Sequence, residues 1–304
     1  MTVDAVLIAG PTASGKSAAA LALAERIGGA LINADSMQVY HEARILTARP
    51  GEAETVCAPH FLYGHVSARD RYDVARYALD AARALGSARA LGRIPIFVGG
   101  TGLYFGALTE GIPDMPRVPE TIRAATRARR EELGAEAFFA ELCARDPRTA
   151  SRLRAPDTQR VLRAYEVLEA TGRPLVEWQS GSTVPLVAGL KVARIVLSPP
   201  RAELHRRIEE RFDAMLKAGA DKEAEQLGDL DPTLPSAKIL GLRELNSARA
   251  GIVGADEAWS ATKAATRQYA KRQLTWFRQR MKDWHWIESQ DPSNIIIRLV
   301  TDCV

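Results

Sequence analysis

A glycine-rich loop near the N-terminus constrains this 304-residue chain more than any other feature. Residues 10–17 match the pattern G-x-x-x-x-G-K-S/T, between an apolar run, Ala5–Ala9, and a helical pattern, Ser17–Ile27. A strand, a glycine-rich turn and a helix in this order bind phosphate through successive backbone N–H groups and the positive end of the helix. The sequence therefore predicts a phosphate site within a βαβ unit.

The residue types of this loop suggest a role for each position. Lys16 supplies positive charge to a bound phosphate, and the Ser17 hydroxyl can ligate Mg²⁺. ATP is the usual ligand, but the chain shows no apolar strand that ends in the carboxylate with which nucleotide hydrolases hold Mg²⁺; Ile94–Val98 runs into Gly99–Gly102 instead. The residues expected to surround the phosphates are Gly10, Pro11, Thr12, Ala13, Ser14, Gly15, Lys16 and Ser17.

The remaining periodicities predict an α/β fold of the P-loop NTPase type. Further apolar runs typical of buried strands are Ala30–Ala34, Ile94–Val98 and Val192–Leu197. A helical pattern covers Val74–Leu91. Strands that alternate with helices form a parallel sheet with helices on both faces. An Arg-rich stretch, Glu120–Arg163, is almost entirely helical in pattern. We expect a core of residues 1–113 and 184–304, interrupted by a helical insertion over residues 114–183.

Composition excludes several classes of protein. Hydrophobic residues make up 46% of the chain, and 41 Lys and Arg oppose 37 Asp and Glu, which is ordinary for a globular protein and excludes disorder. The three cysteines form no Cys-x-x-Cys pair, so we expect neither a disulfide framework nor a zinc ribbon. The first residues show no basic region before a long apolar run, which predicts neither a signal peptide nor a membrane span. These features favour the reducing cytoplasm.

A carboxylate follows the second predicted strand. Asp35 stands directly after Ala30–Ala34. In parallel α/β sheets the carboxyl ends of the strands line the ligand crevice, beside the phosphate loop. Asp35 is therefore a candidate general base or an acceptor near Mg²⁺. The same position also suits the N-cap of the following turn, and the residues alone leave these alternatives open.

Basic residues are concentrated in one predicted helix, Glu257–Asp283. It contains seven basic and two acidic residues, a net charge of +5, whereas the whole chain carries +4. Its basic stripe comprises Lys263, Arg267, Lys271, Arg278 and Lys282, and its apolar stripe Ala270, Leu274, Phe277 and Met281. A cationic outer face favours contact with a nucleic-acid backbone, with an ordinary solvated helix face as the alternative. We expect Tyr269 and Trp276 in the core.

Several of these segments form an ordered set along the chain. The strongest are residues 10–17, 35–40, 98–104 and 265–278, with weaker matches at residues 59–60, 159–163 and 238–244 between them. This set resembles the tRNA dimethylallyltransferases, also called isopentenyl-diphosphate:tRNA transferases. The resemblance implies transfer of a dimethylallyl group from dimethylallyl diphosphate to N6 of adenosine-37, the adenosine 3′ of the anticodon, with Mg²⁺ and the tRNA anticodon stem-loop as partners.

The resemblance also implies roles for single residues. Asp35 becomes the base for the weakly nucleophilic N6 amine, Lys16 stabilises the leaving diphosphate, and Thr101 contacts adenine or diphosphate. An arginine within Arg201–Phe212 reaches the diphosphate; Arg211 is our candidate, although Arg207 lies on the same helical face. Residues implied in tRNA contact are Asp35, Ser36, Met37, Gln38, Thr101, Arg123, Gln159, Arg160, Val161, Leu162 and Arg163, and the basic helix adds Lys271, Arg272 and Arg278.

Two other functions explain part of the pattern. A P-loop kinase of small molecules or nucleosides that uses ATP would explain residues 10–17 but not the basic helix. An RNA-binding module with a nucleotide switch would explain the basic helix but not Asp35 together with Thr101. We expect the chain to act as a monomer, because tRNA itself supplies a large second surface.

Overall fold

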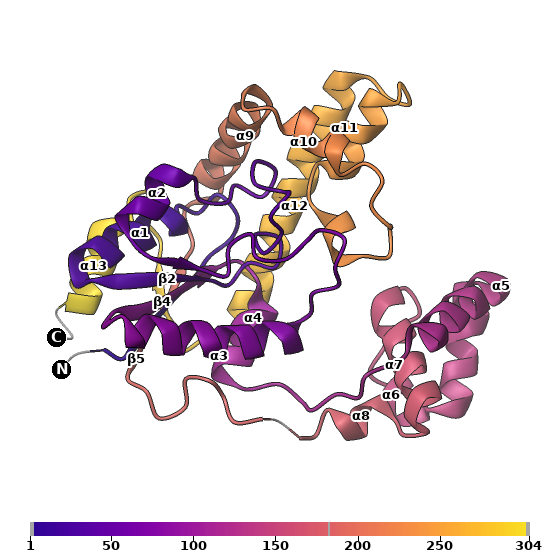
Figure 1. Ribbon diagram of the computed structural model, residues 1–304. Helices are drawn as coiled ribbons and strands as arrows, with labels where there is room; N and C mark the ends of the chain where they lie inside the picture. Colours follow the sequence, from indigo (N-terminus) through magenta and orange to yellow (C-terminus); the bar gives the residue numbers. More distant parts are fainter. Residues whose placement is uncertain (1–2, 182, 302–304) are drawn as a thin grey trace. The chain divides into compact units, whose positions relative to one another are not determined.

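A six-stranded parallel sheet forms the centre of the larger of two compact units in the computed structural model, which describes residues 3–181 and 183–301 (Figure 1). The strand order is β3-β2-β4-β1-β5-β6. The strands are β1 (Ala5–Ala9), β2 (Gly29–Asn33), β3 (His60–Phe61), β4 (Ile94–Gly99), β5 (Val192–Leu197) and β6 (His285–Ile287). The four central strands were expected from their apolar runs, whereas β3 and β6 are too short to show a pattern.

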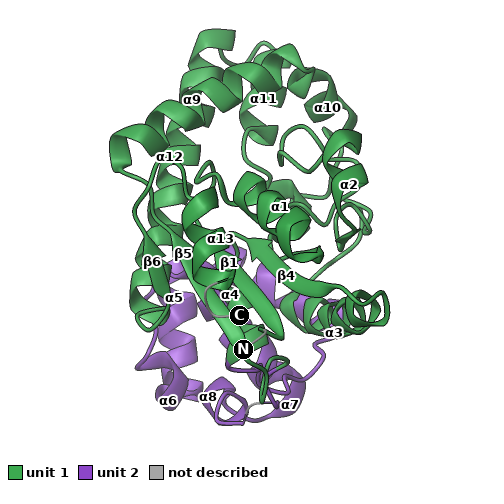
Figure 2. Cartoon of the chain, turned by 90° about the vertical axis from the view of Figure 1, so that its left-hand side faces the viewer, with its two compact units in different colours: residues 1–109, 186–304 green, residues 110–185 purple. Residues whose placement is uncertain are grey.

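Unit 1 comprises residues 1–109 and 186–304, drawn in green in Figure 2. Its helices are α1 (Lys16–Ile27), α2 (Glu52–Cys57), α3 (Val74–Ala90), α4 (Gly102–Thr109), α9 (Arg201–Lys217), α10 (Ala220–Gln226), α11 (Leu242–Arg249), α12 (Ala255–Arg280) and α13 (Ser293–Thr301), with a 3₁₀ turn η1 (Pro235–Lys238). The basic helix predicted over Glu257–Asp283 is thus α12, and it ends at Arg280, before Lys282.

Helices cover both faces of the sheet. Val6 and Ile8 pack with α1 and α13 on one face, while Leu7 and Ala9 face the opposite cluster, to which α3, α4 and α12 contribute. This alternation follows from the two-residue period of a strand. In Figure 1 the first and last helices of unit 1, α1 and α13, accordingly lie side by side although they come from opposite ends of the chain. The expected α/β fold with a parallel sheet covered on both faces is confirmed.

Unit 2, residues 110–185, is entirely helical and has its own core, and the insertion expected over residues 114–183 falls inside this range. Its helices are α5 (Glu120–Arg145), α6 (Pro147–Ala150), α7 (Thr158–Thr171) and α8 (Leu175–Trp178). The helical stretch expected over Glu120–Arg163 is more broken than its pattern suggests. Gly134 interrupts α5, and the Asp146 side chain accepts the Thr149 N–H at 2.9 Å, which caps a new helix at Pro147.

The ends of three adjacent strands bring distant segments of unit 1 together. The Gly10 N–H donates to the Gly99 carbonyl at 3.2 Å, and the Thr101 N–H donates to the Ala34 carbonyl at 3.1 Å. The segments that follow β1, β2 and β4 therefore begin at one edge of the sheet. This is the position at which open parallel sheets bind ligands.

Candidate active site

The phosphate loop, residues 10–17, joins β1 to α1. Ala13 and Gly15 have left-handed backbone conformations, with φ of 63° and 85°. Left-handed residues in such a loop direct successive N–H groups into one concavity, which is an anion-binding arrangement. The loop lines a cavity of about 320 Å³. Six of the eight predicted phosphate residues, Thr12–Ser17, thus line a hollow at the start of a helix, whereas Gly10 and Pro11 are not in its wall.

Lys16 lies at the base of this cavity and is 9% exposed. Its Nζ donates to the Pro11 carbonyl at 3.2 Å. Burial lowers the pKa of Lys16 to about 8; the carboxylate of Asp35 opposes this shift, and the guanidinium of Arg211 adds to it. An anion in the cavity would favour the ammonium form, because opposite charges stabilise each other where little water is present.

Asp35 follows β2 and lines the same cavity. Its Oδ1 accepts the Met37 N–H at 3.0 Å, which is the turn-capping role that the sequence left open. The neighbouring Asn33 side chain holds the Asp35 backbone from both sides, accepting its N–H at 2.8 Å and donating to its carbonyl at 2.9 Å. The turn therefore fixes the carboxylate in place, and capping does not prevent it from facing a ligand.

Thr101 connects the ends of β2 and β4. Its hydroxyl accepts the Ser36 N–H at 2.8 Å and donates to the Ser36 Oγ at 3.1 Å. Gln38, two residues further on, donates through Nε2 to the Thr47 and Ala48 carbonyls at 2.9 and 3.0 Å. Asp35, Ser36, Met37 and Thr101, all predicted from the resemblance, are thus joined by hydrogen bonds beside the phosphate loop, whereas the Gln38 side chain bonds to the separate segment Thr47–Ala48.

Both candidate arginines of α9 line the cavity, but their partners differ. Arg207 is paired with Glu203 at 2.6 Å and donates to the Gln290 carbonyl at 2.6 Å. Arg211 donates to the Thr12 hydroxyl of the phosphate loop. Burial lowers the pKa of Arg211, and the carboxylate of Asp35 opposes that shift. Arg211 therefore keeps a charge that no carboxylate neutralises by direct contact in the described residues, and it is better placed to bind an anion.

A second, smaller cavity of about 60 Å³ adjoins the first. The two share Thr12, Asp35, Thr47 and Arg211 in their walls. Apart from these residues the wall of the smaller cavity is mainly apolar; it includes Met37, Leu46, Ile208, Phe212, Met215, Ile239 and Leu240. A polar, cationic hollow and a small apolar hollow thus meet at Asp35 and Arg211.

The donor set fits a Mg²⁺ ion that is held largely by its substrate. Ser17 is exposed at the start of α1, and its hydroxyl and the Asp35 carboxylate line one cavity. Mg²⁺ commonly takes one or two protein oxygens and completes its shell with phosphate oxygens and water. Within residues 3–181 and 183–301, no three His, Cys, Asp or Glu side chains gather to hold a metal ion by themselves.

Two residues of α12 reach this site although sequence reasoning did not place them there. Tyr269 was expected in the core, but it lines the apolar cavity and hydrogen-bonds to Thr101. Burial and the carboxylate of Asp35 raise the pKa of Tyr269. Gln273 is buried between the phosphate loop and the end of β4. The sequence signal that could have identified Gln273 is a glutamine on the buried face of an otherwise basic helix. Trp276 packs against the core, as expected.

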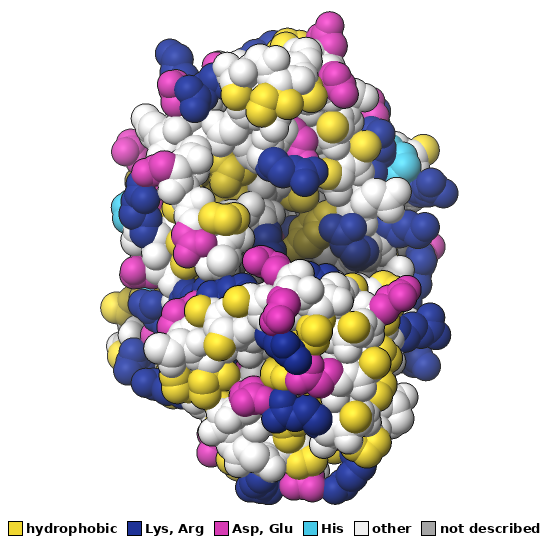
Figure 3. Space-filling model, turned by 90° about the vertical axis from the view of Figure 1, so that its right-hand side faces the viewer, with side chains coloured by type: hydrophobic (Ala, Val, Ile, Leu, Met, Phe, Trp, Pro, Cys, Tyr) yellow, Lys and Arg dark blue, Asp and Glu magenta, His cyan; other side chains and the backbone are white. Residues whose placement is uncertain are grey.

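The outer face of α12 is only partly a free cationic surface. Lys263 pairs with Asp213 at 2.7 Å, and Arg267 pairs with Glu209 at 3.1 Å. The sequence-based expectation of a uniform basic stripe is therefore wrong at Lys263 and Arg267. Their acidic partners lie on α9, and the periodicity of α12 cannot reveal them. On the face of the molecule that Figure 3 shows, basic side chains lie among acidic and apolar ones.

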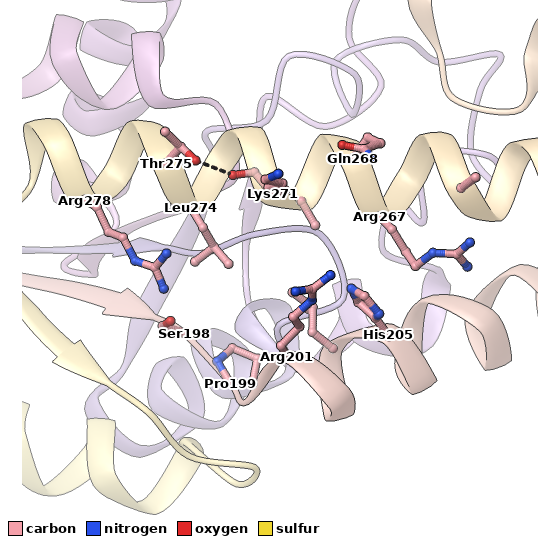
Figure 4. A pocket seen from close by; sticks show the side chains of 13 residues that line it. Ser198, Pro199, Arg201, His205, Arg267, Gln268, Lys271, Leu274, Thr275 and Arg278 are labelled. Atoms are coloured by element: carbon pink, nitrogen blue, oxygen red, sulfur yellow. Dashed lines mark hydrogen bonds between the residues drawn. The ribbon is translucent and has the colours of Figure 1, made fainter.

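A cavity of about 380 Å³ lies between the later part of α12 and the start of α9 (Figure 4). Lys271 and Arg278 line it from α12, and Arg201 and His205 line it from α9. In the described parts of the chain, no acidic side chain pairs with Lys271 or Arg278. Arg272, the third candidate on this helix, is exposed and lies over the Tyr269 ring at 5.7 Å. This end of α12 therefore retains a cationic surface.

The candidate residues of unit 2 differ in exposure. Gln159 and Arg160 are exposed at the start of α7, but Val161 is 2% exposed and packs in the core of unit 2, with Leu162 against the same core. The side chain of Val161 is therefore not available to a ligand. Arg163 donates to the Pro116 carbonyl at 3.4 Å. Arg123 is half-buried, and its Nε is buried with no hydrogen-bond partner in the described residues.

Comparison with known proteins assigns this chain to a family. The model of the family described as IPP transferase matches residues 38–280, and that described as isopentenyl transferase matches residues 3–58. The chain belongs to the IPP transferase family. A tRNA dimethylallyltransferase of Chelativorans sp. (strain BNC1) is 52% identical over 288 residues, covering 93% of this chain and 98% of the relative. One of Bradyrhizobium sp. (strain ORS 278) is 47% identical over 294 residues, covering 96% of each chain.

Solved structures show that this member of the IPP transferase family also resembles known transferases in its fold. The tRNA isopentenylpyrophosphate transferase of Bacillus halodurans is 31% identical, with a TM-score of 0.69 and coverage of 99% of this chain and 96% of the other. A eukaryotic dimethylallyltransferase acting on tRNA has a TM-score of 0.78 and 27% identity, over 97% of this chain and 77% of the other. Membership of the IPP transferase family makes this chain a transferase.

Proposed function

We propose that this protein transfers the dimethylallyl group of dimethylallyl diphosphate to N6 of the adenosine 3′ of the anticodon in tRNA. The observation that carries the proposal is the pair of cavities that meet at Asp35 and Arg211. A prenyl diphosphate has a charged head and a short apolar tail, which match the larger and the smaller cavity. The tRNA-modifying relatives support the same substrate pair.

The kinase alternative is not favoured. The apolar cavity of about 60 Å³ is small for the base and ribose of ATP. The named relatives are transferases that act on tRNA. A phosphate loop therefore serves here to hold a leaving group.

The reaction follows from the groups that line the wall shared by the two cavities. The lone pair of adenine N6 forms a bond to C1 of the dimethylallyl group, and the C1–O bond breaks so that its electron pair leaves with the diphosphate. Asp35 takes the N6 proton as the bond forms. Lys16, Arg211 and the loop N–H groups stabilise the charge that develops on the diphosphate. Mg²⁺, held by Ser17 and diphosphate oxygens, would supply further positive charge to the leaving group.

The proposal includes the tRNA-facing surface and the setting of the enzyme. Lys271, Arg272 and Arg278 would contact tRNA phosphates from unit 1, and the side chains of Arg123, Gln159, Arg160 and Arg163 would contact the anticodon stem-loop from unit 2. The cysteine content favours a reducing cytoplasm. A single copy of the chain would suffice, because the site described above is built within unit 1 of one chain. No helix in the described ranges is long and apolar enough to cross a membrane.

Neutralising Lys271 and Arg278 together should weaken tRNA binding and make it less dependent on salt. Each phosphate contact that is lost reduces the slope of log affinity against log salt by about 1. We therefore expect the slope of the double variant Lys271→Gln, Arg278→Gln to fall by about 2. Binding of labelled anticodon stem-loop across a salt series measures it. Lys263→Gln, whose ammonium is already paired with Asp213, is the matched control. Equal slopes in all three proteins would exclude this face from the tRNA contact.

One incubation tests the proposed function directly. The protein and Mg²⁺ are mixed with dimethylallyl diphosphate labelled in its hydrocarbon part and with unmodified tRNA, beside a parallel reaction with labelled ATP. We expect the label in tRNA, as N6-dimethylallyladenosine after digestion, and no consumption of ATP. Unlabelled tRNA together with hydrolysed ATP would contradict the proposal and restore the kinase alternative.

A further inference from the structure

Gln273 of α12 uses both ends of its amide to join two parts of the site. Its Oε1 accepts the Thr12 N–H at 2.9 Å, and its Nε2 donates to the Gly100 carbonyl at 2.8 Å. The side chain is only 6% exposed. A buried amide whose donor and acceptor are both engaged holds its two partners at a fixed separation.

The two partners belong to opposite sides of the reaction. Thr12 belongs to the part of the site that would bind the diphosphate, because its hydroxyl accepts a hydrogen bond from Arg211. Gly100 precedes Thr101, which holds the segment that begins at Asp35. One amide therefore links the groups that would bind the leaving diphosphate to the groups that would face the acceptor adenine.

The space around this link is tight. A Cβ added to Gly100 would lie 2.2 Å from the Gln273 Nε2 and 3.3 Å from the Asp35 Oδ2. Any side chain at Gly100 would therefore displace the Gln273 amide, the Asp35 carboxylate or both. The close approach requires glycine here and places the amide and the carboxylate near the position that a Cβ of residue 100 would occupy.

We propose that Gln273 is a positioning residue that sets the separation between the leaving-group clamp at Thr12 and Arg211 and the base at Asp35. The inference rests on the proposed function and deepens it, since it concerns the geometry of the transfer step. A displacement of about 1 Å between reacting groups can lower a rate about 10²-fold. Losing the link should therefore reduce turnover while each substrate still finds its own contacts.

The first test replaces Gln273 with methionine, which has a similar length and volume but neither hydrogen bond. Prenyl transfer to tRNA gives kcat and the two KM values, and titration with inorganic diphosphate gives the number of intact sites. We expect Gln273→Met to lower kcat per intact site about 10²-fold, with the Kd for diphosphate changed less than about threefold. Gln279→Met, on the exposed face of the same helix, is the matched control and should leave kcat, both KM values and the Kd for diphosphate unchanged.

The second test uses the variant Gln273→Glu, whose behaviour depends on its protonation state. The neutral carboxyl donates through O–H and accepts through C=O, as the amide does, whereas the carboxylate cannot donate to the Gly100 carbonyl. Burial and Asp35 raise the pKa of the new carboxyl, while Lys16 and Arg211 oppose that shift. We expect the activity of the variant, divided by that of the unchanged protein at each pH, to rise as pH falls from about 9 to 6.

These readouts distinguish the two levels of the proposal. If the unchanged protein leaves tRNA unlabelled, the proposed function fails before any variant is compared. If it labels tRNA but the kcat per intact site of Gln273→Met is within threefold of that of the unchanged protein, the positioning role of Gln273 is overturned. An activity ratio for Gln273→Glu that falls as pH falls would overturn it equally, because the neutral carboxyl, which can make both hydrogen bonds, would then be the less active form.

Discussion

Replacing Asp35 with alanine should lower kcat for prenyl transfer about 10³-fold, which is within the range that a general base contributes. Binding of inorganic diphosphate should be retained, because the loop N–H groups, Lys16 and Arg211 remain. While Lys16 is protonated, removing a carboxylate that lies near Lys16 and Arg211 also removes a negative charge that repels the anion. Single-turnover transfer to tRNA and calorimetric titration with diphosphate measure the two effects separately.

Asp35 also caps a turn, and a second variant separates that role from catalysis. In Asp35→Asn the side-chain oxygen can still accept the Met37 N–H, which Oδ1 accepts at 3.0 Å in the protein. The amide cannot take a proton from N6. We therefore expect Asp35→Asn to lose turnover nearly as completely as Asp35→Ala while its Tm stays close to that of the unchanged protein. Activity within tenfold of normal in Asp35→Asn would eliminate Asp35 as the base.

Lys16→Ala should weaken diphosphate binding by about 2 to 3 kcal/mol, or about 30- to 150-fold in Kd, which is the size of a hydrogen bond to a charged group. The effect is large because Lys16 is buried at the base of the cavity, where little water can replace the ammonium. Turnover should fall too, since charge accumulates on the diphosphate as the C1–O bond breaks. Lys222→Ala, at an exposed position on α10, is the control.

The pH dependence of the same titration identifies the ammonium. Burial lowers the pKa of Lys16 to about 8 in the free protein, and a bound diphosphate favours the protonated form. The Kd of the unchanged protein should therefore be constant below about pH 8 and rise above it, by up to about tenfold per pH unit. Lys16→Ala should show no rise in this range. A rise of equal steepness in both proteins would assign the titration to another group.

Local patterns predicted the fold and the first contacts of the site. Apolar runs located β1, β2, β4 and β5, and the spacing of glycines located the phosphate loop before any tertiary information was used. Asp35 was found because the end of a parallel strand has a fixed place relative to its neighbours. These inferences depend on short stretches of chain whose geometry the residues themselves determine.

Contacts between distant elements were not visible in the same way. The acidic partners of Lys263 and Arg267 lie on α9, so helix periodicity alone overstated the basic stripe of α12. Tyr269 was expected in the core, but it is only partly buried, and its neighbour across the site, Asp35, comes from the segment that follows β2. Gln273 required knowledge of both Thr12 and Gly100. Such contacts depend on how helices dock on the sheet, which one sequence pattern does not encode.

The strand order also governs how the protein can acquire its activity during synthesis. β1 is made first, yet it lies between β4 and β5, and β5 begins only at Val192. The contact between Thr12 and Gln273 spans 261 positions. A nascent chain that ends before β5 has one edge of its first strand unpaired, and the two halves of the reaction centre are joined only when α12 has left the ribosome. Folding is therefore governed by long-range contacts, which form slowly, and the catalyst is complete only after α12 has been synthesised.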